Sequence, residues 1–456
     1  MSNFNLVLNG RVIRTYFYYV LPSIIGLLAI TSANLIDGIF VGNFIGANAL
    51  AAITLMIPYF TILIAVAIML AIGGAVSAGK ALGEKNQSVA NHIFSQSLIA
   101  AAVINLIFAL LSLIFEAQLF SLLNIPDEIT PLAASYLNVI RWVFIIQLTT
   151  MVLYYLVRAD NHPLLATCAL VTGAVLNIAL DAWFIVYLEL GLAGAAYATA
   201  IAQVIQFLVL SRYFFSKNKT LNFTLMQKNW HLLLRSAYNG VSELISELSV
   251  GIIFFILNAV MIARLGVEGV AAFTLVNYFI FLSIMISYGF ADALHLVISQ
   301  NFGAQQFKRV QHFLIVALMS TLTLGLIIGL ILLIWPESSI GWFINQEQIL
   351  VQQVSLQLLF LLLPLFLING TNIILTCYLT AVHQPKPSAI IAITRSLILP
   401  ALLLVSFHYF LSHWLILPNI NPNLTFIIAL PLSEWLAFLL AGYFCWRYRP
   451  AKLVSK

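Results

Sequence analysis

Long, uninterrupted apolar runs recur along almost the whole chain, and they limit the folds open to it. One helical bilayer crossing needs about 20 apolar residues, because the hydrocarbon core is roughly 30 Å thick. Such runs follow one another through 456 residues, of which 62% are hydrophobic and only 8% are charged. Soluble domains carry about 25% charged residues, and a membrane β-barrel would alternate polar and apolar residues. The sequence therefore predicts an all-α integral membrane protein.

The positions of these runs predict twelve membrane-spanning helices. The first run follows two arginines and lacks the small-residue cleavage site of a signal peptide, so we expect it to remain as a helix. The predicted spans cover residues 16–41, 50–78, 92–115, 131–157, 163–187, 190–214, 236–263, 270–299, 310–335, 348–381, 387–411 and 425–447.

Basic residues are distributed unevenly between the two sides of the predicted membrane. Most lysines and arginines fall on the side of the N-terminus, whereas Arg264 is the one clearly basic residue among the acids of the other side. The positive-inside rule assigns the basic side to the cytoplasm, so we expect both termini there. The net charge of +5 then reflects topology, and we expect no nucleic-acid partner.

The two halves of the chain resemble each other in sequence. Residues 46–92 align without a gap on residues 266–312, and nine of the 47 positions are identical. The identities include loop glycines, which pair Gly46 with Gly266 and Gly83 with Gly303. Further along, "RADNHP" aligns with "TAVHQP", so that Pro163 pairs with Pro385. The sequence thus contains an internal repeat.

This repeat predicts two six-helix bundles in the same orientation. We place the N-lobe at residues 1–214, a polar cytoplasmic linker at 215–235 and the C-lobe at 236–456. In transporters, parallel repeats of this kind are related by a pseudo-two-fold axis along the membrane normal. We therefore expect substrate to bind between two lobes that rock to expose it to either side.

Several separated motifs carry a family resemblance. They are "LIDGIFVGNFIGANALAA", "RADNHP", "LNIALDAWFIVYLELGLAGAAYATAIAQ", "SQNFGA" and "NGVSELISELS". Together they resemble the multidrug and toxic compound extrusion (MATE) family, in its DinF/MepA-type branch. The resemblance covers nearly the whole chain, and it implies a V-shaped twelve-helix exporter driven by a proton or sodium gradient.

The same resemblance implies where such a protein works and with what. We expect a multi-pass monomer in the cytoplasmic (inner) membrane of a bacterium. Its partners would be small-molecule substrates and the lipid bilayer, and it would need no cofactor besides the coupling ion H⁺ or Na⁺.

Carboxylates inside the predicted spans are the candidate functional groups, because charges facing hydrocarbon are costly and usually point into the bundle. Asn177 and Asp181 are four positions apart in the sequence, so they share one helix face. The repeat places leucines opposite Asp37, Asn177 and Asp181, so this polar cluster belongs to the N-lobe alone. The family resemblance implies that a cation-binding pocket is formed by Asp37, Asn177, Asp181 and Thr199.

Two coupling ions fit those residue types. A proton carrier needs a carboxylate whose pKa is raised by desolvation or by a neighbouring carboxylate. Two carboxylates, an amide carbonyl and a hydroxyl would equally offer hard oxygen ligands to Na⁺. The sequence leaves both open.

The predicted C-lobe has its own ionisable groups. Glu243 and Glu247 lie in the seventh span, and Asp292 and His295 lie in the eighth. The spacing within each pair places its two side chains on one helix face. We consider these four residues candidates for substrate binding or a proton relay, with structural roles and, for Glu243, contact with water as the alternatives.

Three further charged residues have structural interpretations. We interpret Arg395 and Glu434 as structural. Arg141 could contact an anionic substrate, but we expect it to snorkel outward.

Aromatic side chains suggest the type of substrate. We expect an apolar cleft that favours bulky amphipathic cations through burial and cation–π attraction. The residues expected near this cleft are Met56, Tyr59, Phe60, Tyr154, Tyr155, Tyr278 and Phe281. The alternative is that they pack between helices without contacting substrate.

Enzymatic functions find no support in the motifs. The sequence has no GxxxxGK[ST] loop for ATP and no HExxH or GxSxG motif, each of which carries a known chemistry. We therefore predict that the chain is not an enzyme. The alternative is a flippase for a lipid-linked sugar or another lipid, but its cleft would need several arginines or lysines to bind pyrophosphate.

Overall fold

The computed structural model of the chain describes residues 6–225, 229–341, 349–410 and 421–453. Helices joined by short loops make up these ranges, which contain no β-strand. Within these described ranges, twelve helices are long and apolar enough to cross a membrane, which confirms the predicted all-α membrane fold. They are Val12–Ile45, Ala47–Gly83, Gln87–Ile114, Thr130–Ala159, Pro163–Tyr187, Gly191–Phe215, Val241–Gly266, Glu268–Gly303, Phe307–Ile334, Leu350–Ala381, Pro385–Tyr409 and Pro422–Arg447.

The chain divides into two compact units. Unit 1 consists of Met1–Leu244 and Ser299–Gln306, and unit 2 consists of Ile245–Ile298 and Phe307–Lys456. The long helix α10 (Val241–Gly303) therefore contributes to both units. The division into lobes at 1–214 and 236–456 with a linker at 215–235 stays a prediction.

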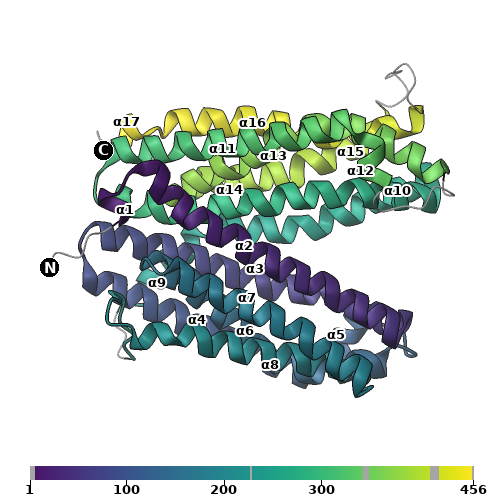
Figure 1. Ribbon diagram of the computed structural model, residues 1–456, viewed down its shortest axis with the longest axis horizontal. Coiled ribbons are helices and arrows are strands. Elements are labelled where there is room, and N and C mark those ends of the chain that lie inside the picture. The colour runs from purple at the N-terminus through teal and green to yellow at the C-terminus, as the bar shows by residue number, and fades with distance from the viewer. Residues whose placement is uncertain (1–5, 226–228, 342–348, 411–420, 454–456) are drawn as a thin grey trace. The chain divides into compact units, whose positions relative to one another are not determined.

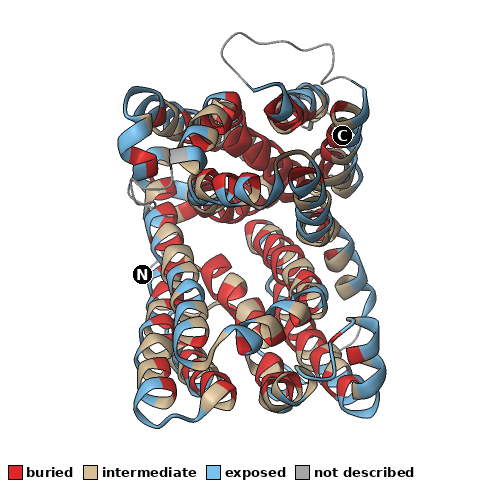
Figure 2. Ribbon diagram, turned by 90° about the vertical axis from the view of Figure 1, so that its right-hand side faces the viewer, coloured by how far each residue is buried: buried red, intermediate tan, exposed pale blue. Residues whose placement is uncertain are grey.

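Unit 1 is a bundle in which α6 packs against α3, α4 and α8, while α7 packs against α2 and α8. Buried residues lie on the helix faces turned toward the inside of the bundle, and exposed residues lie on the outer faces (Figure 2). Many of the exposed residues are large and apolar, as expected for membrane-spanning helices. The elements in chain order are α1 (Leu6–Asn9), α2 (Val12–Phe40), η1 (Val41–Ile45), α3 (Ala47–Gly83), α4 (Gln87–Ile114), α5 (Glu116–Leu122), α6 (Thr130–Ala159), α7 (Pro163–Asp181), η2 (Ala182–Tyr187), α8 (Gly191–Ser211), η3 (Arg212–Phe215) and α9 (His231–Asn239) (Figure 1).

Unit 2 is organised around α13, which packs against α11 and α16. Its apolar core joins residues of α10 to residues of α13, including Phe273 and Leu362. The elements that follow α10 are α11 (Phe307–Ile334), α12 (Pro336–Gly341), α13 (Ile349–Ala381), α14 (Pro385–Ile393), η4 (Thr394–Ile398), α15 (Leu399–Tyr409), η6 (Pro422–Ile428), α16 (Ala429–Arg447) and α17 (Pro450–Leu453) (Figure 1).

The internal repeat is also present in the backbone. Gly46 precedes α3 and Gly266 interrupts α10, and both have the positive φ that glycine adopts at little cost. Three loop pairs that the repeat aligns share a positive φ. They are Gly46 (φ 116) with Gly266 (φ 66), Lys85 (φ 59) with Gln305 (φ 56), and Asn161 (φ 65) with His383 (φ 56).

The segment between the sixth and seventh spans is attached to unit 1 over part of its length. The amide nitrogen of Asn222 donates to Asn91 Oδ1 at 2.9 Å, and that of Thr224 donates to Ser95 Oγ at 3.0 Å. The segment then forms α9, and the seventh span begins at Val241 rather than at the predicted residue 236. The polar composition of the segment indicates a linker but does not reveal α9.

The Asp160 carboxylate fixes the start of this segment. It accepts hydrogen bonds from the amide nitrogens of Thr220 and Leu221 at 2.6 and 3.2 Å, and from the hydroxyls of Thr220 and Tyr213. Asp160 is 1% exposed. The three donors of Thr220 and Leu221 hold these residues against the loop between α6 and α7, and the Tyr213 hydroxyl connects η3 to the same carboxylate.

Candidate cation site and other polar clusters

Three helices of unit 1 carry the residues predicted to hold a cation. Asp37 lies on α2, Asn177 and Asp181 lie on α7, and Thr199 lies on α8. Because α7 packs against both α2 and α8, the four residues come from adjacent helices. The Asn177 amide donates from Nδ2 to Thr199 Oγ1 at 3.4 Å, which links α7 to α8 directly.

The two carboxylates of this group are not neutralised within the described part of the chain. Asp181 is 0% exposed, and neither of its oxygens accepts a hydrogen bond from a described residue. Asp37 Oδ1 is likewise buried without a donor among those residues. The two carboxylates lie close enough to interact electrostatically. Buried acceptors in this state favour a bound cation or proton, because uncompensated burial of charge is strongly unfavourable.

A phenol that the sequence analysis did not single out belongs to the same surroundings. Tyr136, on α6, is 7% exposed and lies near both Asp37 and Asp181. Its ring also packs against Phe60, with the centroids 6.4 Å apart. The sequence could not identify Tyr136 as a neighbour of the two carboxylates, because an aromatic residue in an apolar span is equally typical of ordinary helix packing.

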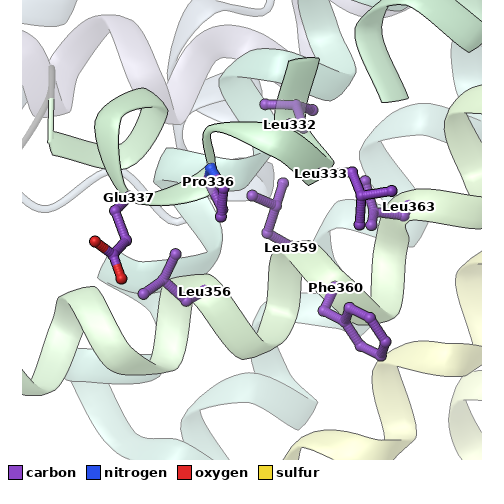
Figure 3. A pocket seen from close by; sticks show the side chains of 8 residues that line it. All are labelled: Leu332, Leu333, Pro336, Glu337, Leu356, Leu359, Phe360 and Leu363. Atoms are coloured by element: carbon purple, nitrogen blue, oxygen red, sulfur yellow. The ribbon is translucent and has the colours of Figure 1, made fainter. Parts of the chain in front are cut away.

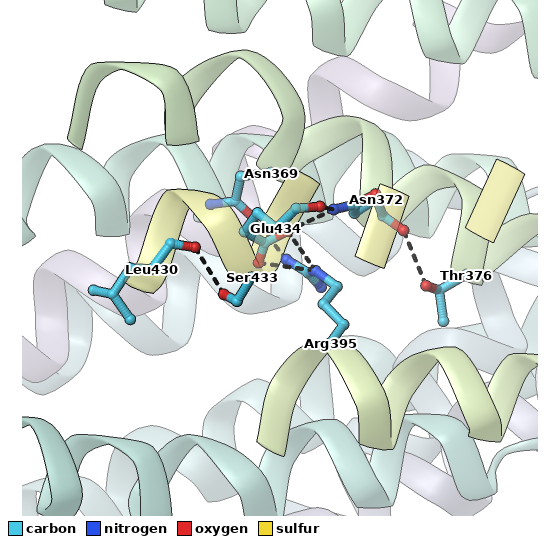
Figure 4. Close-up of polar contacts among 7 residues, drawn as sticks. All are labelled: Asn369, Asn372, Thr376, Arg395, Leu430, Ser433 and Glu434. Carbon is cyan, nitrogen blue, oxygen red and sulfur yellow. Dashed lines mark hydrogen bonds and ion pairs between the residues drawn. The ribbon is translucent and has the colours of Figure 1, made fainter. Parts of the chain in front are cut away.

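Unit 2 contains a connected polar network that ties three elements together (Figure 4). Arg395, in η4, pairs with Glu434 on α16, and its Nη2 donates to Asn369 Oδ1 on α13 at 2.7 Å. Asn372, also on α13, donates from Nδ2 to Glu434 Oε2 at 2.6 Å. Each charge thus has several partners, an arrangement that favours the structural interpretation of Arg395 and Glu434.

The four other candidates all lie on α10. Glu243 and Glu247 are partly buried, and they fall in unit 1 and unit 2 respectively. Asp292 and His295 belong to unit 2, and each is 4% exposed. Their roles in binding or relay stay predictions.

The expected outward orientation of Arg141 is wrong. This residue is 1% exposed, and its guanidinium pairs with Glu116, the first residue of α5, while Nη2 also donates to Asn138 Oδ1 at 3.1 Å. Snorkelling keeps the charged head of an arginine in water, whereas here Glu116 neutralises the guanidinium of Arg141 inside unit 1. Here the acid belongs to a different helix and lies far from Arg141 in the sequence, so helix periodicity could not reveal it.

Part of the predicted aromatic cleft is helix packing instead. Met56 and Phe60 are buried in the apolar core of unit 1, and Phe60 packs against Phe144 with ring centroids 5.0 Å apart. Tyr154 is 3% exposed, and its hydroxyl accepts from Arg158 Nη1 at 3.1 Å. By contrast, Tyr278 and Phe281 are 43% and 44% exposed.

The twelve spans, the repeat and the buried carboxylates define a polytopic helical membrane transporter. The chain belongs to the MatE family, whose model matches residues 22–183 and 244–405. Each match covers one copy of the internal repeat. The two matches therefore agree with the repeat, and they confirm the family resemblance of the sequence.

Known proteins of this family are similar over most of their length. The multidrug export protein MepA of Staphylococcus haemolyticus is 24% identical over 402 residues, which cover 87% of this chain and 88% of MepA. A multidrug resistance MATE family transporter in an outward-facing conformation has a TM-score of 0.87 at 24% identity, covering 99% of both chains. A MATE protein in complex with MaL6 has a TM-score of 0.90 at 23% identity, covering all of both chains. These similarities establish the fold.

Proposed function

We propose that the chain is a secondary active antiporter that exports amphipathic, cationic small molecules in exchange for H⁺ or Na⁺. The observation that carries the coupling is the burial of Asp181, whose two oxygens have no donor among the described residues, within electrostatic range of Asp37. The relatives named as multidrug export proteins support the class of substrate.

The coupling follows from the state of this polar cluster. A proton or Na⁺ at Asp37, Asn177, Asp181 and Thr199 neutralises buried charge and favours one packing of α2, α7 and α8. Its release favours another packing, because two buried carboxylates repel each other. Substrate that binds better to the cation-free packing lowers the affinity of the protein for the cation, and the bound cation lowers its affinity for substrate. This reciprocal effect couples the two ligands. Rocking of two lobes would convert that exchange into export.

The buried and partly buried arginines favour this proposal over a lipid-linked sugar flippase. Pyrophosphate binding needs cations that are available to the ligand. Arg141 pairs with Glu116, and Arg395 pairs with Glu434. Arg264 donates from Nε to His408 Nδ1 at 3.1 Å, and Arg158 donates to Tyr154 and Ser23. All four of these guanidinium groups are thus engaged by the protein.

Reconstituted transport tests the proposal. Liposomes that contain the protein are loaded with ethidium, and the pH gradient and the Na⁺ gradient are imposed separately. We expect one gradient to drive dye movement and the other to have no effect, which also identifies the ion. Liposomes containing the Asp37→Asn plus Asp181→Asn variant are the control. Dye movement that responds to neither gradient would rule out the antiporter.

The membrane location and topology extend the same proposal. The charge bias supports the cytoplasmic membrane with both termini inside. Single cysteines placed in the 215–235 segment of an otherwise cysteine-free chain should react with membrane-impermeant maleimide only after the cells are opened. Labelling of intact cells would reverse the topology.

A further inference from the structure

A leucine-rich cavity in unit 2 carries an inference that goes beyond the proposed transport. The cavity has a volume of about 230 Å³ and lies among α11, α12 and α13 (Figure 3). Its lining is apolar except for one ionisable side chain, that of Glu337, and it includes Leu333, Leu359, Phe360 and Leu363. Glu337 and Phe360 lie toward opposite ends of the lining (Figure 3).

The internal repeat shows what occupies the matching place in unit 1. It aligns α4 with α11 from end to end, and it aligns the last residues of α6 and α13. The short helices α5 and α12 follow α4 and α11, and each has an acid in its first turn, Glu116 and Glu337. In unit 1, Arg141 of α6 neutralises that acid. The alignment of α6 with α13 places Leu363 opposite Arg141.

Unit 2 therefore has the acid but lacks the guanidinium. Glu337 makes no ion pair with any described residue. At the position that aligns with Arg141, unit 2 has the apolar side chain of Leu363, which lines the cavity. The comparison of the two halves thus specifies the missing chemistry, which is a positive group next to Glu337.

The placement of the cavity specifies the rest of the ligand. Leu333 and Phe360 are 53% and 60% exposed and belong to membrane spans, so the lining faces the acyl chains of the bilayer. Glu337 lies just beyond Ile334, where the span of α11 ends, which is the depth of lipid headgroups. Leu363 lies well inside the span that begins at Leu350. The lining thus extends from the headgroup region toward the hydrocarbon core.

We infer that this cavity binds one acyl chain of a phospholipid whose headgroup carries a primary ammonium, with the ammonium on the Glu337 carboxylate. Drug-sized ligands occupy cavities of about 300–1,000 Å³, so the smaller volume here favours a single alkyl chain. A primary ammonium donates charge-assisted hydrogen bonds to a carboxylate, whereas a quaternary ammonium has no proton to donate and an anionic headgroup is repelled.

Native mass spectrometry of the purified full chain tests the site. The protein is mixed with phosphatidylethanolamine, phosphatidylcholine or phosphatidylglycerol of identical acyl chains, and retained lipid is measured. We expect retention to fall in that order. Glu337→Gln should reduce the preference for phosphatidylethanolamine over phosphatidylglycerol about twofold to fivefold, the range for an exposed ion pair. Glu268→Gln, which removes another exposed acid of unit 2, should not change it.

A second variant imitates unit 1. Leu363→Arg supplies the guanidinium that Arg141 supplies in the other half, and it should remove the lipid preference in protein that stays monodisperse and folded. Equal retention of the three lipids by the wild type would overturn the inference. So would an unchanged preference in Glu337→Gln, or binding of dodecyltrimethylammonium without any preference for phosphatidylethanolamine. Because the readout is lipid binding, failure here leaves the transport proposal unaffected.

Discussion

Arg395, in η4, donates from Nε to both carboxylate oxygens of Glu434 on α16, at 3.0 and 2.9 Å. The two side chains are only 12% and 14% exposed. Asn369 and Asn372 of α13 satisfy further groups of the pair (Figure 4). Within unit 2, one ion pair therefore connects η4, α13 and α16.

We predict that removing one partner of this pair destabilises the protein more than removing both. Glu434→Gln leaves a guanidinium in the bundle without its counter-charge, which costs about 3–5 kcal/mol. The double variant Arg395→Met plus Glu434→Leu should recover most of that loss, because it removes both charges. Thermal unfolding in detergent measures the difference. A single variant as stable as the wild type would show that the pair contributes little.

Two glycines allow helix backbones to touch within unit 1. A Cβ added to Gly303 would lie 2.1 Å from the Lys80 carbonyl oxygen, and one added to Gly83 would lie 2.1 Å from that of Gln300. The repeat relates these two contacts, since it aligns Gly83 with Gly303 and Lys80 with Gln300. They bring the end of α3 against the end of α10.

We expect Gly303→Ala to force these two helix ends apart and to lower stability by about 1–3 kcal/mol. Gly329→Ala on α11 is the matched control, because a Cβ there meets no heavy atom within 4 Å. That control should be neutral or gain up to about 1 kcal/mol from helix propensity. Equal melting temperatures for both variants would contradict the close contact.

The Asp160 tether gives a third prediction. The carboxylate faces four donors, and Asp160→Asn replaces this acceptor-only group by an amide that carries protons of its own. The resulting loss of about 1–3 kcal/mol in local stability should expose the chain at Lys217 and Lys219. Limited trypsin digestion followed by mass spectrometry measures cleavage at these two sites. Asp127→Asn, an exposed acid elsewhere in unit 1, should leave the cleavage rate unchanged. Cleavage of the Asp160→Asn variant at the wild-type rate would show that the tether is not needed.

The sequence predicted the spans well because their signal is local. A run of apolar residues needs no partner to identify it as a membrane span, and the repeat that aligns Gly46 with Gly266 can be found in the sequence alone. Polar partnerships are different, because they depend on which helices become neighbours. Arg141 was expected to snorkel outward, although it forms an ion pair with Glu116 inside unit 1. Tyr136 and the Asp160 tether escaped prediction for the same reason.

The predicted role of Asp292 and His295 on α10 in substrate binding or proton relay can be tested. Asp292 and His295 are both 4% exposed in unit 2. If they take part in binding or relay, Asp292→Asn should change the range of dyes exported or the pH dependence of export, while the amount of folded protein in the membrane stays the same. Export of all dyes at the wild-type rate across the pH range would assign the pair to packing.

The last prediction concerns the coupling itself. Asp181 and Asp37 are the charged members of the unit 1 cluster, whereas Asn177 and Thr199 contribute a neutral amide and a hydroxyl that already contact each other at 3.4 Å. Replacing either aspartate by asparagine removes a carboxylate charge that we propose binds the ion, so Asp37→Asn and Asp181→Asn should each lower gradient-driven efflux by at least about tenfold. Asn177→Ala and Thr199→Ala should weaken the apparent cation affinity only about twofold to tenfold, since each removes one neutral ligand.

Efflux from liposomes under the active gradient measures the loss in the aspartate variants, and dye binding without a gradient verifies that the variants still fold. Glu189→Gln, an exposed acid between α7 and α8, is the control and should transport normally. Wild-type efflux in both aspartate variants would make the cluster a structural feature and would require another coupling site.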